Sequence, residues 1–154
     1  MTAIQASAPH EHPSGRKLIV GFVTGFIAVL LFHQPALALL TQLGVAKAAT
    51  YSLSATAPFG VPQVVSLSFW GGVWGVVFAL VEHRVPRGGR YWVYAFLFGA
   101  IFPTLVAWFV VAPMKGLPMA GGWQASRMFT AFVINGAWGL GNALLLALGL
   151  RRLR

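Results

Sequence analysis

Polar side chains interrupt the apolar stretch 18–43 at His33-Gln34-Pro35. A polar group inside a long apolar helix costs free energy in a membrane unless it faces the interior of a bundle and finds a partner. Pro35 has no N–H, so in an α-helix it frees the carbonyl of Leu31, and we expect a kink there. A buried imidazole beside a kinked helix can form a binding pocket, and it can equally hold two helices together through a hydrogen bond.

Two asparagines, Asn135 and Asn142, are seven residues apart and therefore share one face of a helix. At the rise of an α-helix, Asn135 lies about 10 Å and His33 about 15 Å below the outer surface. The same zone contains Ser66, Ser68 and Thr104. We therefore expect a small polar cavity that opens outward, and for the two asparagines hydrogen bonding between helices is the alternative. The candidate ligand contacts are His33, Gln34, Ser68, Asn135 and Asn142.

Few residues remain for acid–base, nucleophilic or metal chemistry. The chain has two acids, Glu11 and Glu82, no cysteine and four histidines. This composition excludes paired carboxylates, thiolate nucleophiles, zinc clusters and Ser-His-Asp triads. We therefore expect no catalytic residue, no metal and no cofactor, and an enzyme is the least favoured class. Glu82 is expected to form ion pairs with Arg84, Arg87 and the C-terminal arginines.

The elements that position these side chains are four apolar runs. The chain has 154 residues, 58% of them hydrophobic and 8% charged, which is too little charge for a soluble domain. Each run has about the 20 residues that a helix needs to cross a bilayer. We predict an all-α, four-helix transmembrane bundle, with Gly44 ending the first helix, Pro62 opening the second and Pro113 closing the third. The four predicted spans are 18–43, 63–81, 91–112 and 128–150.

The basic residues predict the orientation of these spans. The net charge is +9, and eight of the 11 Lys and Arg residues lie before the first span, between the second and third, or after the fourth. The positive-inside rule then places both termini in the cytoplasm, in the inner membrane of a bacterium. Residues 1–15 read as a disordered cytoplasmic tail; 16–38 also imitate a signal peptide, but apolar sequence continues beyond them. Because the charges flank apolar runs, they indicate a lipid bilayer as partner and no nucleic acid.

Small residues predict how the helices pack, because helices in lipid associate through close backbone approach. Gly72 and Gly75 lie on one face of the second span, and Gly136 and Gly139 repeat the arrangement in the fourth. Close helix packing is the favoured interpretation of these glycines, and a ligand groove is the alternative.

An internal repeat explains why the glycines of the second span recur in the fourth. At an offset of 64, the second span aligns with the fourth and both carry G-x-W-G; at an offset of 74, the first aligns with the third. The halves then form two tandem two-helix repeats in parallel orientation. The alignment places Ala107 opposite His33, which argues against a symmetric bis-histidine haem site.

The segments Phe32-His33-Gln34, Phe59-Gly60-Val61-Pro62-Gln63 and 68–75 resemble a group of small bacterial inner-membrane proteins. The resemblance covers most of the chain after residue 16. It implies a four-span fold in a bacterial inner membrane, and it implies no activity.

Three function classes follow from these features, of which a membrane enzyme is the least favoured. The favoured class is an accessory or small-ligand-binding membrane component with an outward-facing polar cavity, and a small oligomeric transporter or pore is the alternative. The expected partners are lipid and either a membrane protein or further copies of the chain.

Overall fold

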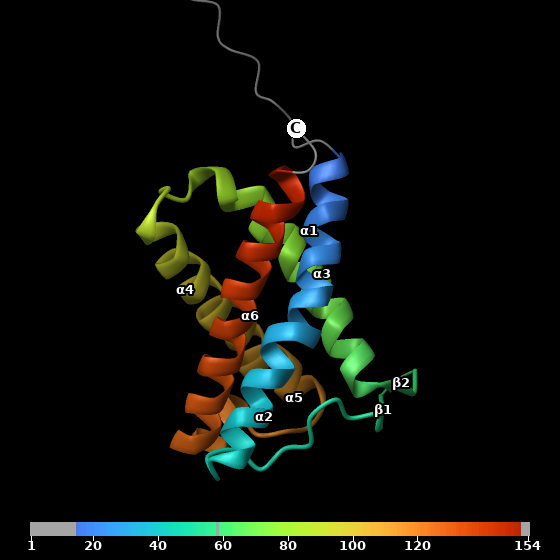
Figure 1. The fold of residues 1–154 in the computed structure, drawn as a ribbon. Helices are drawn as coiled ribbons and strands as arrows, with labels where there is room; N and C mark the ends of the chain where they lie inside the picture. Colours follow the sequence, from blue (N-terminus) through green and yellow to red (C-terminus); the bar gives the residue numbers. More distant parts are fainter. Residues whose placement is uncertain (1–14, 58, 152–154) are drawn as a thin grey trace, which may run out of the picture.

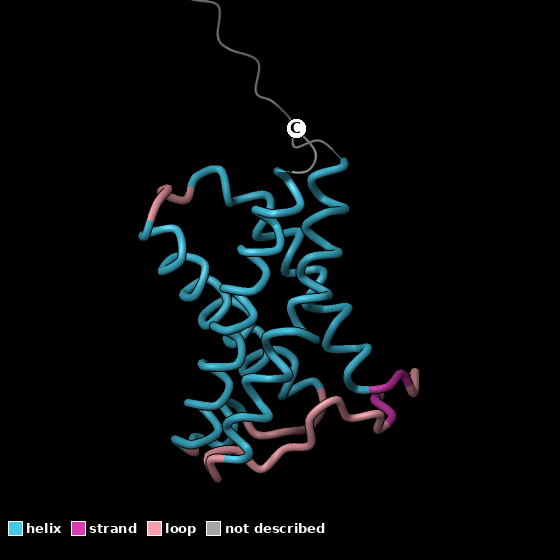
Figure 2. Tube along the Cα trace, in the orientation of Figure 1, coloured by secondary structure: helices cyan, strands magenta, loops and turns pink. Residues whose placement is uncertain are grey.

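The computed structural model describes residues 15–57 and 59–151 and contains four long helices (Figures 1 and 2). Each is long and apolar enough to cross a membrane. The first and third helices each contain a π-helical turn. The elements of the four helices are α1 (Gly15–Ala28), η1 (Val29–His33) and α2 (Gln34–Gln42); α3 (Gln63–Val81) and η2 (Glu82–Arg84); α4 (Gly89–Val106), η3 (Ala107–Val111) and α5 (Ala112–Met114); and α6 (Ala125–Arg151). The protein is an all-α, four-span membrane protein, and the expected tail 1–15 falls almost entirely outside the described residues.

Two of the three predicted helix ends are confirmed. Gly44 follows the first helix with a φ of 72°, and the amide of Val45 donates to the carbonyl of Leu40, a typical glycine C-cap. Pro62 is the N-cap of α3. The prediction that Pro113 closes the third helix is wrong by one residue, because this proline lies within α5 and the helix ends at Met114.

The four helices form two hairpins, α1 with α3 and α4 with α6, which meet mainly along α1 and α6. The two outer helices, α3 and α4, are not closely packed against each other. Both hairpins begin at the same end of the molecule, where α3 also ends and α6 finishes (Figure 1). The hairpins therefore have the parallel orientation that the internal repeat predicts.

Glycines form the seam of each hairpin in equivalent ways. A Cβ atom added to Gly75 would overlap the carbonyl of Gly21 and the Cα of Gly25. In the second hairpin, a Cβ on Gly139 would overlap the carbonyl of Ala95 and would make a tight contact with the Cα of Gly99. These contacts obey the offsets of 64 and 74 found in the sequence.

In both hairpins, the glycine three residues before the seam glycine packs against an aromatic ring of the other helix. Gly72 lies against the ring of Phe22, and Gly136 lies against the ring of Phe96. Phe22 and Phe96 also correspond at the offset of 74. The repeat thus extends from sequence to packing.

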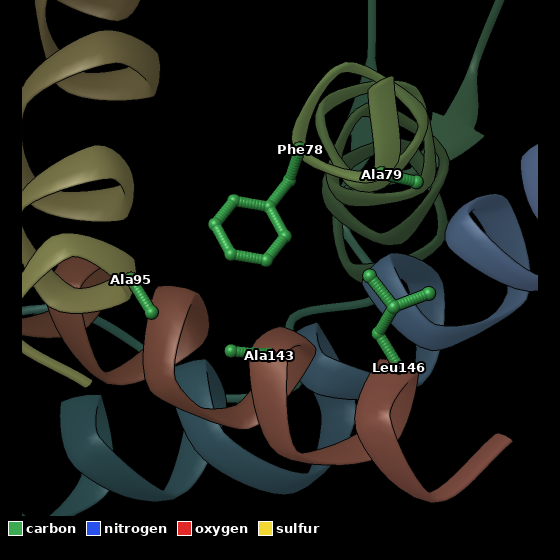
Figure 3. Packing of buried hydrophobic residues seen from close by; sticks show 5 residues of the cluster. All are labelled: Phe78, Ala79, Ala95, Ala143 and Leu146. Carbon is green, nitrogen blue, oxygen red and sulfur yellow. The ribbon is translucent and has the colours of Figure 1, made fainter. Parts of the chain in front are cut away.

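A buried cluster joins the two hairpins near the end that carries both described chain ends (Figure 3). Phe78 points from α3 toward α4 and α6, while Leu146 points from α6 toward α1 and α3 (Figure 3). Ala95 and Ala143 complete the contact between α4 and α6. Small and large side chains therefore alternate across this interface, as close packing requires.

The long connections lie at the opposite end. Between α2 and α3 the chain forms a two-residue antiparallel ladder, β1 (Ala55–Thr56) with β2 (Val61–Pro62), visible in Figure 2. This small hairpin was not expected from the sequence. In the connection to α6, the 3-10 segment η4 (Met119–Trp123) contains four successive residues with positive φ, from Ala120 to Trp123.

Candidate functional site

The π turn η1 precedes Pro35 and changes which carbonyl the proline leaves free. The amide of Gln34 donates to the carbonyl of Val29, five residues earlier. In this register the missing N–H of Pro35 would have paired with Leu30, whereas an α-helix would have freed Leu31. The hydroxyl of Tyr51 donates to the Leu30 carbonyl at 2.7 Å and satisfies it.

Gln34 holds the same tyrosine by its backbone. The amide of Tyr51 donates to Oε1 of Gln34 at 2.7 Å, and the Gln34 side chain is almost completely buried. Tyr51 has a φ of 50°, a conformation that costs free energy for a non-glycine residue. The two hydrogen bonds offset this cost and fasten the α2–β1 connection to the first helix.

His33 is the last residue of the π turn and is 8% exposed. Its Nδ1 lies 3.5 Å from Nε2 of Gln34, the outer limit of a hydrogen bond. No hydrogen-bond partner for its Nε2 is found among residues 15–57 and 59–151. The imidazole therefore has one ring nitrogen that the described part of the protein leaves without a partner.

The two asparagines both form contacts between helices. Nδ2 of Asn135 donates to Oγ1 of Thr104 at 2.8 Å, which joins α6 to α4. The side chain of Asn142 lies 2.9 Å from Oγ1 of Thr24, which joins α6 to α1. Hydrogen bonding between helices, one of the two interpretations of this pair, is confirmed.

Asn142 is fully buried and only partly satisfied. Thr24 has one hydroxyl proton, yet its Oγ1 lies within reach of both the Asn142 side-chain amide and the Gly21 carbonyl. The Thr24 hydroxyl therefore donates to only one of these two oxygens at a time, that of the Asn142 amide or that of the Gly21 carbonyl. Either way, one end of the Asn142 amide lacks a partner in the described residues.

The five candidate contacts fall into separate groups. Ser68 donates to the carbonyl of Val64 in its own helix, at 2.8 Å. Gln34 and His33 are neighbours beside Tyr51, whereas Asn135 pairs with α4 and Asn142 with α1. Among the described residues, no hydrogen bond joins His33 to either asparagine.

The polar features of the first π turn do not recur in the second. The amide of Ala112 donates to the carbonyl of Ala107, and Pro113 follows directly, as Pro35 follows Gln34. The second π turn lies four residues later in the repeat than the first, so His33 still aligns with Ala107 at the offset of 74, while Val111 is the residue that ends the second π turn. His33 and Gln34 therefore belong to one hairpin only.

Glu82 forms an ion pair, as predicted, but with a different partner. Its Oε2 lies 3.2 Å from Nζ of Lys17 at the start of α1, the only ion pair within 15–57 and 59–151. Of the expected partners, Arg84 and Arg87 are exposed and form no ion pair with another described residue, and the side chains of the C-terminal arginines lie outside the described residues. The difference arises because α1 and α3 are packed side by side, which brings the start of one to the end of the other. No group of three or more potential metal-binding side chains is found in that part of the chain.

Three partners were not identified from the sequence. Thr24 and Tyr51 are the residues that hold Asn142 and Gln34, and Nε1 of Trp138 donates to the carbonyl of Gly25 at 2.9 Å. Thr24 could have been identified from the sequence, since it is a hydroxyl residue inside an apolar run. Trp138 belongs to the repeated G-x-W-G motif, but its contact with the other hairpin depends on how the hairpins dock.

No protein-family model, curated protein or solved structure matches the chain.

Proposed function

We propose that this protein is an accessory component of a bacterial inner membrane, with both termini and the α3–α4 connection in the cytoplasm. The observation that supports this proposal is the pairwise use of the polar side chains inside the bundle. Asn135 pairs with Thr104, Asn142 with Thr24, and Gln34 with Tyr51. These contacts stabilise neighbouring elements and leave few groups to line a path across the membrane.

The charges support an accessory role over the alternative of a small oligomeric transporter or pore. Proton-coupled transport usually depends on an ionisable group within the membrane. In the described residues the one acid, Glu82, lies at the end of α3 and is paired with Lys17. The bundle therefore lacks an acid at the depth where such a carrier needs one.

Site-specific cross-linking in native membranes tests this function, and the absence of cysteine makes single-cysteine variants unambiguous. We choose Trp70→Cys, on the exposed face of α3, and Phe78→Cys, in the buried cluster, as its matched control. With a bifunctional thiol- and photo-reactive reagent, Trp70→Cys should give an adduct with a different membrane protein, and Phe78→Cys should not. Adducts between copies of this chain alone would support the pore, and adducts with lipid alone would also contradict the accessory role.

A second candidate function, the binding of a small polar ligand from the outer side, is favoured by His33. Nε2 of His33 has no partner among the described residues and is not one of their fully buried unsatisfied atoms, so a hydrogen-bonding ligand can reach it at the surface of the bundle. Gln34 is its nearest polar neighbour, and Ser68, Asn135 and Asn142 are the further candidate contacts.

Chemical modification from one side of the membrane tests whether this site opens outward. Diethyl pyrocarbonate, applied to right-side-out vesicles, should modify His33 and should leave His83, beside Glu82 at the other end, unmodified. Modification of His83 but not of His33 would contradict an outward-facing cavity.

A further inference from the structure

An apolar groove of about 250 Å³ lies between the two outer helices of the molecule. One wall is formed by Phe78 and Val81 at the end of α3 and by Val85 directly after η2, and the other along α4 includes Tyr94, Ile101 and Phe102. The groove exists because each hairpin packs its own glycine seam, so α3 and α4 are not drawn together. Aromatic rings bridge the separation, with the centroids of Phe78 and Phe98 5.1 Å apart.

Positive charge is concentrated at one end of this groove. Arg84, Arg87 and Arg90 are all exposed, and none of them forms an ion pair with another described residue. Arg84 directly precedes the lining residue Val85. Arg90 lies four residues before the lining residue Tyr94, which places both on the same face of α4.

The length of the groove suits one leaflet of a bilayer. The lining on α4 runs from Tyr94 to Phe102, a rise of about 12 Å, and the distance from Arg90 to Phe102 is about 18 Å. Half of the hydrocarbon core of a typical membrane is about 15 Å thick. An acyl chain lying against α4 would therefore keep its headgroup level with the arginines.

We propose that the α3–α4 groove binds an anionic phospholipid, with one acyl chain between Phe78 and Ile101 and the phosphate on Arg90 and its neighbouring arginines. Basic residues between spans at the positively charged face are typical of sites for anionic headgroups. The apolar groove holds the acyl chain, and the unpaired arginines select for negative charge over a zwitterionic headgroup. This inference is independent of the accessory role and of the His33 site.

Native mass spectrometry of the full chain tests this site. The protein is released from mixed micelles that contain equal amounts of phosphatidylglycerol and phosphatidylcholine with identical acyl chains. The wild type should retain one phosphatidylglycerol in preference to phosphatidylcholine, and Arg90→Gln should weaken that retention about fivefold. Ile101→Trp, which fills the groove, should lower the retention of both lipids.

Two controls separate this site from general effects of charge and bulk. Arg16→Gln removes an exposed charge at the same end but on α1, and Val93→Trp adds an indole to the exposed side of α4 outside the groove. Both should bind like the wild type. Equal retention of the two lipids by the wild type, an equal loss in Arg16→Gln and Arg90→Gln, or a lipid-free dimer would overturn the proposal.

Discussion

At the scale of single residues, Tyr51 supplies the hydrogen-bond donor that Pro35 lacks. A backbone carbonyl without a partner is costly in hydrocarbon, where water cannot replace the lost hydrogen bond. Because of the π turn, the carbonyl left without a backbone partner is that of Leu30, and the Tyr51 hydroxyl donates a hydrogen bond to it. The proline is therefore tolerated because a residue in the following connection supplies the missing donor.

Replacing this donor should destabilise the protein measurably. We expect Tyr51→Phe to lower the free energy of unfolding by about 1 kcal/mol, because the ring is kept and only the hydroxyl is lost. Tyr94→Phe is the matched control, since no hydrogen bond of the Tyr94 hydroxyl is found within the described residues. Reversible unfolding in mixed micelles measures both, and equal stability of the two variants would show that the Leu30 contact contributes nothing.

The contact between Thr24 and Asn142 belongs to the same scale. Thr24→Val should destabilise the protein more when Asn142 is present than in the Asn142→Leu background, because the single change leaves a buried amide without a partner. Contacts of this kind in membranes average about 0.6 kcal/mol of coupling. A double-mutant cycle on the same unfolding measurement gives the coupling, and a value of zero would contradict the assignment.

At the scale of elements, the glycine seams determine which helices pair. We predict that Gly75→Leu reduces the yield of folded monomer far more than Val76→Leu, because only the former side chain would enter the backbone of α1 at Gly21 and Gly25. Size-exclusion chromatography of detergent-extracted protein measures the yield. Equal yields for the two variants would contradict a close helix contact at Gly75.

Much of the element structure was predictable, because hydropathy and small-residue spacing act locally. The predicted spans end within about three residues of the observed helices, and the two-helix repeat was visible in Gly75 and Gly139. The π turns were not predictable, because α-helical geometry is the default before a proline and the partner of Leu30 lies 21 residues away. The sequence also did not reveal which helices would be neighbours between the two hairpins, since every span is apolar on most of its faces.

The candidate site was predictable only as a set of residue types. Polar residues inside apolar runs did identify Gln34, Asn135 and Asn142 as buried or partly buried groups. Their separation into three contacts depends on the rotation of each helix and on the docking of the hairpins. Depth along a helix, which the sequence does reveal, does not determine which neighbour a side chain faces.

At the scale of the whole molecule, the charge distribution predicts how the bundle sits in the membrane. Reporter fusions after residues 46 and 116 should be periplasmic, and fusions after residue 87 and at the C-terminus cytoplasmic. The starts of α1 and α4 and the end of the α3–η2 helix share one end of the molecule (Figure 1). This end carries Arg16 and Lys17 of α1, Arg84 of η2 and Arg90 of α4. A cytoplasmic signal from the fusion at residue 116 would contradict four spans.

In each hairpin the seam glycines pack closely against the other helix of the same hairpin, and only the segment 85–88 connects α4 to the end of the first hairpin. The chain is thus divisible: residues 1–86 and 87–154, produced as two polypeptides in the same cell, should reassemble into a complex that copurifies on a single tag. Trp138→Phe should weaken this fragment complementation, because it removes the hydrogen bond to Gly25 across the two halves. Folding can then proceed in two steps during synthesis, with the first hairpin complete in the bilayer before the second is made.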